Sequence, residues 1–188
     1  MRNKAIRALS IKILFGAALA AVNVAARATD TLEVPGVELY YMSGLPENHD
    51  ATARVRLLDA RFRKYLAQYG YSLAPPLNDP DVKVQVASGY LFHHSDVAAA
   101  LARQAGAGWM VLAHLVQPTS LWAEFNVQLV EAATGRIRAD YDVELKGPVN
   151  DGKDTDRAAE RMVQKLDGFL KRFAEAQSGS AGVPAKGD

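Results

Sequence analysis

The 188-residue chain contains no cysteine. Disulfides, thiol nucleophiles, iron–sulfur clusters and Cys-ligated zinc are therefore excluded, and stability must come from packing. The chain also lacks the G-x-S-x-G, H-E-x-x-H, Walker A and G-x-G-x-x-G motifs. Its 49% hydrophobic content is instead typical of one ordinary folded core. We therefore expect a non-enzymatic protein that needs no cofactor.

Residues 1–28 have the pattern of a secretory signal peptide. Basic residues precede the apolar run Ile13–Val22, and Ala26-Arg27-Ala28 matches an A-x-A cleavage signal. The run is short for a hydrocarbon layer of about 30 Å, and no stop-transfer segment follows it. We expect cleavage after Ala28, export to the periplasm and no transmembrane anchor afterwards; an uncleaved anchor is the alternative.

Removal of the signal peptide reverses the net charge. The full chain has 22 basic and 21 acidic residues, whereas residues 1–28 hold five basic residues and no acid. The chain from Thr29 onward therefore carries 17 basic and 21 acidic groups, a formal charge of −4. A nucleic-acid binder is expected to be basic, so this class is excluded.

Hydrophobic periodicity predicts the elements of a single domain over 37–175, after a leader at 29–36 and before a disordered tail at 176–188. Alternating or continuous apolar runs predict strands, and three- and four-residue spacing predicts helices. The expected strands lie at 37–45, 71–75, 82–88, 108–118, 121–131 and 136–145. The expected helices lie at 53–70, 96–107 and 154–176.

The two strands around Thr134-Gly135 are the most regular part of the chain. Apolar and polar residues alternate on both sides of this turn, so one face of the hairpin is expected to be buried and the other wet. The apolar stripe of 154–176 is predicted to cover the buried face. The result is an α/β (α+β) fold: a single mixed, largely antiparallel sheet of about five or six strands with three helices.

Two features are candidate partner-binding residues. The helix at 53–70 carries basic side chains mostly away from its apolar stripe, which makes either a solvated surface or a basic docking patch on an acidic protein. Trp122 lies on the polar side of its strand in the alternation. Its ring either packs on the sheet or is an exposed residue that contacts a partner. The candidate set is Arg54, Arg56, Arg61, Arg63, Lys64 and Trp122.

The turn at 92–96, "FHHSD", is the candidate metal site. His93, His94 and Asp96 offer two imidazoles and a carboxylate to a borderline metal, whereas adjacent histidines in a strand point to opposite faces. A surface turn without metal is the alternative. The segment "NDGKDTD" (150–156) lacks EF-hand spacing and is interpreted as a loop with a helix cap.

Residues 106–147 resemble a family of small exported bacterial proteins of unknown function. The resemblance lies in a Gly-Ala start of a strand, a Val-x-x-x-Ser-Leu stretch that joins two strands, and an Ala-Thr-Gly hairpin turn whose second strand ends at a glycine. The matching positions are Gly106, Ala107, Val116, Ser120, Leu121, Ala133, Thr134, Gly135, Arg136 and Gly147. Over 37–173 the strand–helix order is also similar to the TolB N-terminal and curli-secretion (CsgG-like) fold of envelope proteins.

This resemblance implies a non-catalytic role in partner docking or assembly in the envelope, in some relatives alongside quinoprotein dehydrogenase systems. The chain departs from the family where a Cys-containing turn is replaced by "FHHSD" and where an Asp-rich stretch is reduced to "GPVNDGKDTD". We therefore expect an interaction or assembly-accessory module with an envelope protein as partner. The alternative function is a small-ligand or metal carrier that uses the 92–96 turn.

Overall fold

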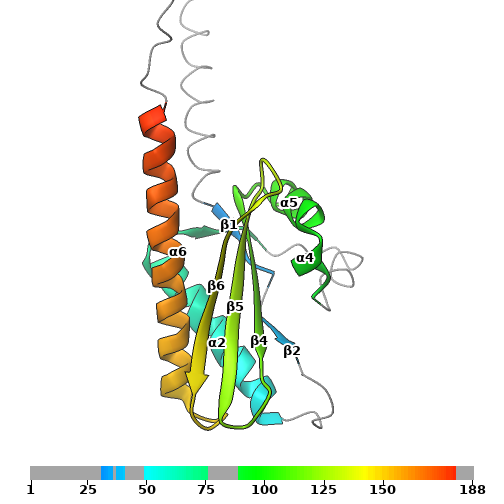
Figure 1. The fold of residues 1–188 in the computed structure, drawn as a ribbon, viewed down its shortest axis with the longest axis vertical. Coiled ribbons are helices and arrows are strands. Elements are labelled where there is room, and N and C mark those ends of the chain that lie inside the picture. Colours follow the sequence, from blue (N-terminus) through cyan, green and yellow to red (C-terminus); the bar gives the residue numbers. More distant parts are fainter. Residues whose placement is uncertain (1–30, 36, 41–48, 76–88, 181–188) are drawn as a thin grey trace, which may run out of the picture.

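The computed structural model describes residues 31–35, 37–40, 49–75 and 89–180 (Figure 1). The elements in chain order are β1 (Thr31–Glu33), β2 (Val37–Tyr40), α2 (His49–Gln68), β3 (Ser72–Leu73), α4 (Tyr90–His93), α5 (Ser95–Gln104), β4 (Trp109–Val116), β5 (Trp122–Glu131), β6 (Ile137–Lys146) and α6 (Gly152–Ser180).

The strands form one six-stranded mixed sheet. Its order is β3-β1-β4-β5-β6, and β2 also pairs with β4. β1 and β2 run parallel to β4, whereas β4–β5 and β5–β6 are antiparallel and form the longest ladders. The prediction of a mixed α/β sheet with long antiparallel strands is confirmed. Among the residues described there is a fourth helix, the single turn α4, that the periodicity did not predict.

The hairpin β5–β6 follows the predicted alternation. Ala123, Phe125, Val127 and Leu129 are fully buried, while the residues between them on β5 are half-buried. On β6, Asp140, Asp142 and Glu144 are exposed, whereas Val143 and Leu145, which alternate with them, are buried. The pleat therefore gives this part of the sheet one apolar and one polar face.

Helices α2 and α6 cover the apolar face, as the apolar stripe of 154–176 predicted (Figure 1). Phe62 of α2 meets Phe125 of β5 edge-on, with ring centroids 5.4 Å apart and both side chains fully buried. Met162, Val163 and Leu166 of α6 lie in the same cluster. This layer holds most of the buried apolar surface, which is the main favourable term in folding.

The opposite face is only partly covered. Helix α5 packs its alanines, with Leu91 of α4, against the start of β4 and the end of β5, where Met110, Leu112 and Val130 are buried. Small side chains allow this helix to lie close to the sheet. Phe92 of α4 packs on His114 of β4, with ring centroids 4.2 Å apart. Among the residues that the structure describes, no helix lies over the lower halves of β5 and β6 on that face (Figure 1).

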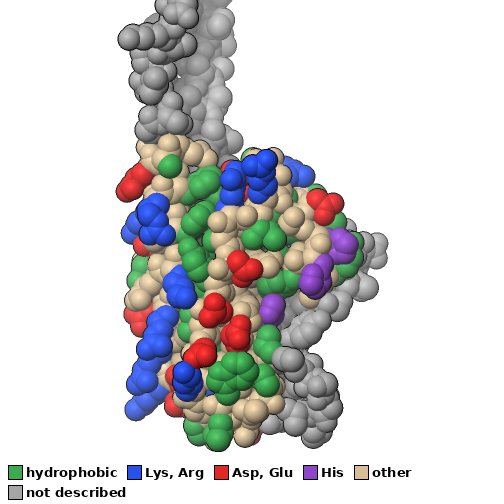
Figure 2. All heavy atoms as spheres, in the orientation of Figure 1, with side chains coloured by type: hydrophobic (Ala, Val, Ile, Leu, Met, Phe, Trp, Pro, Cys, Tyr) green, Lys and Arg blue, Asp and Glu red, His purple; other side chains and the backbone are tan. Residues whose placement is uncertain are grey.

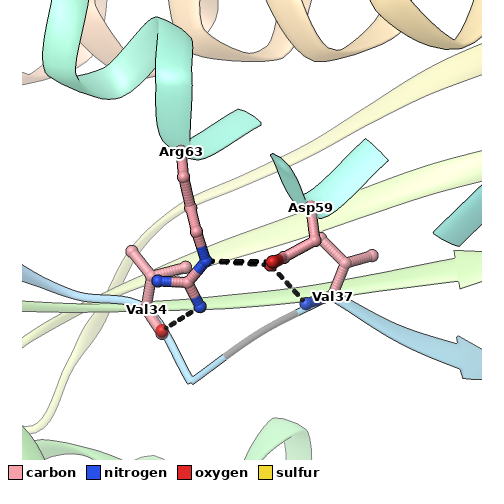
Figure 3. A network of polar contacts seen from close by, with 4 residues as sticks. All are labelled: Val34, Val37, Asp59 and Arg63. Atoms are coloured by element: carbon pink, nitrogen blue, oxygen red, sulfur yellow. Dashed lines mark hydrogen bonds and ion pairs between the residues drawn. The ribbon is translucent and has the colours of Figure 1, made fainter. Parts of the chain in front are cut away.

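Polar contacts attach α2 to the link between β1 and β2 (Figure 3). The Asp59 carboxylate accepts hydrogen bonds from the Val37 amide, at 3.1 Å, and from Nε of Arg63, at 3.0 Å. The same guanidinium donates to the Val34 carbonyl, at 2.7 Å. This network holds the first two strands against the helix that follows them.

The structure corrects two boundaries. The predicted leader, 29–36, contributes β1 to the sheet, and Leu32, Glu33 and Val34 are buried. The predicted tail starts too early, because α6 continues to Ser180. The strand predicted at 82–88 and the second half of the one at 37–45 lie outside the described residues.

Candidate interaction site

The uncovered part of the sheet is the strongest candidate site. We define the open face as the polar side of β4, β5 and β6 beyond α5. Its side chains are His114, Trp122, Glu124, Asn126, Gln128, Asp140, Asp142, Glu144 and Lys146. Figure 2 shows this side of the molecule, with acidic side chains gathered over the strands and basic ones along α6 beside them.

The register of the strands places these residues in rows. His114 pairs with Asn126, which pairs with Asp142; Glu124 pairs with Glu144 in the next row. Two carboxylates directly opposite each other on neighbouring strands repel, and an acidic pair at this position favours a cationic partner.

Polar contacts within the open face neutralise only part of its charge. Gln128 Nε2 donates to Asp140 Oδ2 at 3.1 Å, and Lys146 Nζ lies 2.6 Å from Glu144 Oε2. Burial lowers the pKa of His114, although the negative charge of Asp140 acts in the opposite direction. The imidazole is therefore biased toward its neutral form, and the open face is acidic.

A groove runs along the outer side of β6, the terminal strand of the sheet. It measures about 670 Å³ and is lined by residues of both β6 and α6. Both elements contribute charges of either sign to its lining, which is formed by Asp142, Val143, Glu144 and Lys146 of β6 and by Asp154, Arg161, Gln164 and Lys165 of α6.

Of the predicted basic docking residues, Arg54 is not at the surface. Its side chain is buried and donates to Oγ1 of Thr155 at 3.3 Å, to Oε1 of Gln117 at 3.1 Å and to the Pro148 carbonyl at 3.1 Å. Arg54 therefore offers no exposed cation to a partner, because its guanidinium joins α2 to α6 and to the segments that follow β4 and β6.

The other basic residues of α2 do not form one patch. Arg61 is paired with Asp156 of α6 at 3.1 Å, and Arg63 is held by Asp59 as described above. Arg56 and Lys64 are exposed. The helix therefore presents two solvent-facing cations, and its half-buried arginines are engaged in contacts between elements.

The candidate metal ligands lie in and after α4. His93 and Asp96 are exposed, whereas His94 is half-buried and stacks on Tyr90 at 3.8 Å between ring centroids. Over 31–35, 37–40, 49–75 and 89–180, no group of three or more His, Asp or Glu side chains is placed to hold a metal ion. The geometry therefore does not bring His93, His94 and Asp96 together as a ligand set.

Trp122 lies on the open face, as its place in the alternation predicts, and is half-buried. Its amide donates to Oγ1 of Thr119 at 3.0 Å, and its carbonyl accepts from Gln117. Leu121 beside it is 62% exposed, which adds apolar surface at the end of the β5–β6 hairpin.

The acidic residues of the open face were recognised in the sequence only as the wet side of the hairpin. The alternation of Asp140, Asp142 and Glu144 with buried residues was the available signal. The sequence did not reveal that no helix covers this side, since coverage is a property of the tertiary arrangement.

These features define a class: an α/β domain with two long helices on one sheet face and an open, acidic opposite face. The chain belongs to the family DUF3280, described as "Protein of unknown function (DUF2380)", whose model matches residues 31–166. The resemblance to a family of unknown function is thereby confirmed, while the TolB-like and CsgG-like naming of the fold remains a prediction.

Solved structures with a similar fold share little sequence with this chain. The PelC dodecamer from Paraburkholderia phytofirmans is 12% identical, with a TM-score of 0.48 over 75% of this chain and 89% of that one. The hypothetical protein CT253 from Chlamydia trachomatis is 13% identical, with a TM-score of 0.49 over 74% and 96%. The lipoprotein GNA1162 from Neisseria meningitidis is 12% identical, with a TM-score of 0.46 over 77% and 96%.

Comparison with curated protein sequences finds no match. Within the residues that the structure describes, no helix is both long enough and apolar enough to cross a membrane.

Proposed function

We propose that this protein is an exported, non-catalytic interaction module of the cell envelope, and that it docks a partner protein on its open face. The observation that carries the proposal is the difference in helix coverage between the two faces of the sheet. α2 and α6 pack on the apolar face, whereas no helix among the described residues packs on the lower part of the other face.

The composition of the open face supports docking. Glu124, Asp140, Asp142 and Glu144 place four carboxylates on a rigid hairpin, and Trp122 adds a large amphipathic ring at its end. Aromatic anchors surrounded by polar groups are frequent in protein interfaces. A paired strand also fixes the backbone that carries these side chains, which limits the ordering cost on binding.

Photo-crosslinking in living cells tests this function. A benzophenone amino acid is placed at Asp142, which is exposed on the open face, or at Lys64, which is exposed on α2. We expect one discrete crosslinked product of defined mass from position 142 and none from position 64. Crosslinks from position 64 alone would assign docking to α2, and the absence of any product at either position would refute a docking function.

The location of the protein has its own test. Export predicts that the protein recovered from a periplasmic extract begins at Thr29, with residues 1–28 removed. Intact mass measurement distinguishes this form from the full chain. A full-length protein in the membrane fraction would show that the N-terminal segment acts as an anchor.

A further inference from the structure

We propose that the free edge of β6 takes up an extended segment of the partner as a seventh strand, and that this segment carries Lys or Arg at alternate positions above the open face. The inference rests on the proposed docking function and specifies how the partner binds. In this mode, main-chain hydrogen bonds supply affinity and alternate side chains supply specificity.

The hydrogen-bond pattern identifies which backbone groups of β6 point away from the sheet. The Gly147 amide donates to the Leu121 carbonyl at 2.9 Å, so this antiparallel pair is of the hydrogen-bonded type. Hydrogen-bonded and non-bonded pairs alternate along the ladder. The pairs of Glu144 with Glu124 and of Asp142 with Asn126 are therefore non-hydrogen-bonded pairs. The backbone N–H and C=O groups of Glu144 and Asp142 accordingly point away from β5, toward the free edge of the sheet.

A side chain of α6 marks the same edge. Lys165 Nζ donates to the Asp142 carbonyl at 2.9 Å, which places that carbonyl on the outer side of β6. Within the part of the chain that the structure describes, this is the one hydrogen bond to the outward backbone groups of Asp140, Asp142 and Glu144. Lys165 is exposed, so its ammonium group can return to water when a partner amide takes its place.

The groove beside β6 provides the space for such a strand. Its volume of about 670 Å³ is bordered by the β6 edge and α6, and it opens to solvent. An exposed edge of ten residues is a template for pairing with another chain. Natural edges that must stay unpaired are covered or carry charge, and here the charge also selects the partner.

Charge decides which occupant fits. On the open-face side, the neighbours of an added strand are Asp140, Asp142, Glu144 and Lys146. Lys146 is paired with Glu144, but three carboxylates face one ammonium group, so cationic side chains are favoured there. A second copy of β6 paired antiparallel about Asp142 would place carboxylate opposite carboxylate in the rows of Asp140, Asp142 and Glu144. Self-pairing is therefore disfavoured, and a basic segment of another protein is the occupant.

The other side of the added strand faces α6. Arg161, Gln164 and Lys165 line this wall together with Asp154, so its net charge is positive, and small, polar or acidic residues of the partner segment are favoured there over basic ones. The edge therefore selects a pattern in which basic residues alternate with small polar ones. A uniformly basic segment would meet cations on one of its two sides.

A peptide experiment on the purified mature protein tests the inference. The probe is an acetylated heptapeptide of alternating Lys and Thr, compared with the same peptide containing Glu in place of Lys. We expect saturable binding of the Lys peptide, binding at least tenfold weaker for the Glu peptide, and slower hydrogen exchange at the amides of Asp140, Asp142 and Glu144. Equal affinity for the two peptides would overturn the charge selection.

Backbone methylation separates strand addition from simple charge attraction. Two Lys–Thr peptides of equal charge are N-methylated on alternate amides, one on the Lys amides and the other on the Thr amides. Because one set faces β6 and the other faces away, one peptide is expected to lose at least tenfold in affinity while the other binds normally. Equal binding of both would overturn strand addition.

Two variants of one position provide the matched control on the protein. Asp142→Pro removes an outward amide without touching the ladder to β5, whereas Asp142→Asn removes the charge and keeps the amide. We expect Asp142→Pro to abolish both peptide binding and the peptide-dependent slowing of hydrogen exchange at the β6 edge. Asp142→Asn is expected to weaken peptide binding by a smaller factor than Asp142→Pro. Crosslinking from position 142 in cells with no peptide effect would refute the strand and leave the docking function standing.

Sedimentation equilibrium excludes the remaining occupant. We expect the protein without peptide to sediment as a monomer at micromolar concentration. A dimer that Asp142→Pro dissociates would show that a second copy occupies the edge, and the inference would be wrong.

Discussion

Arg54 of α2 and Thr155 of α6 lie 101 positions apart in the chain, yet Nε of the arginine is 3.3 Å from Oγ1 of the threonine and both side chains are buried. The same guanidinium reaches Gln117 in the β4–β5 connection and the Pro148 carbonyl after β6. Burial lowers the pKa of Arg54, while the carboxylates of Asp154 and Asp151 oppose that shift. One cation thus joins the two covering helices to the lower end of the hairpin.

Arg54→Met is predicted to destabilise the protein by on the order of 3 kcal/mol, because the hydrogen-bond partners of the guanidinium become unsatisfied in a buried site. Arg54→Lys should recover only part of this loss, since a single ammonium cannot reproduce the fork of donors. Urea unfolding measures both variants. Arg56→Met, at an exposed position of the same helix, should change stability by less than about 0.5 kcal/mol; a similar loss there would contradict the assignment.

Glu33 is predicted to make stability fall as the pH rises. Its side chain is 2% exposed, one carboxylate oxygen has no hydrogen-bond partner, and burial raises its pKa from 4.5 to about 7, although Arg63 acts to lower it. The folded state therefore binds a proton that the unfolded state releases between these two values. This stabilisation is complete below pH 4.5 and is lost as the pH rises through 7.

The magnitude follows from the size of the shift. A rise in the pKa of Glu33 from 4.5 to about 7 corresponds to a difference of about 3 kcal/mol in the free energy of unfolding between pH values below 4.5 and above 7. Urea unfolding from pH 4.5 to pH 8 should show the decline in the natural chain and not in Glu33→Gln, which keeps the shape of the side chain without its charge. His114 contributes in the opposite direction in both proteins, so the difference between them isolates Glu33. Parallel pH profiles would contradict the prediction.

Leu166 tests the contribution of α6 to the core. It is fully buried in the layer between α6 and the sheet, whereas Gln164 on the same helix is exposed beside the groove. Leu166→Ala is expected to cost about 2–5 kcal/mol through lost burial and the cavity that remains. Gln164→Ala should stay within about 0.5 kcal/mol. Thermal unfolding compares the two, and equal melting temperatures would mean that α6 does not stabilise the sheet.

Much of the central architecture was predictable because long amphipathic elements leave a clear period. Ten-residue strands on either side of a turn specify which side is apolar, and the stripe through Met162 and Leu166 specifies the covering helix. Ile137 is an exception. It was expected on the buried side but is 44% exposed, because the register of β5 and β6 shifts between Leu129 and Val130.

Short elements and buried charges were not predictable in this way. β1 has three residues, too few to show any period, and its place in the sheet depends on pairing with β4. Arg54 had a usable signal: it lies four residues before Leu58 and eight before Phe62, on the buried side of α2. The open face could not be predicted from the sequence, because its extent depends on which part of the sheet α5 covers, and only the tertiary structure shows this.

Gly135 is predicted to be required for the hairpin turn by its backbone conformation rather than by lack of space. Its φ is +70°, a region that favours glycine, and a Cβ placed there would meet Cα of Asp96 and Cβ of Ala99 at ordinary contact distances of 3.7 and 3.8 Å. Gly135→Ala should therefore cost about 1 kcal/mol, from the left-handed conformation alone. Gly135→Asn should cost less, because asparagine tolerates this region better than alanine. Chemical unfolding of the two variants measures this order, and a larger loss for Asn than for Ala would show that steric contact with α5, rather than φ, limits the position.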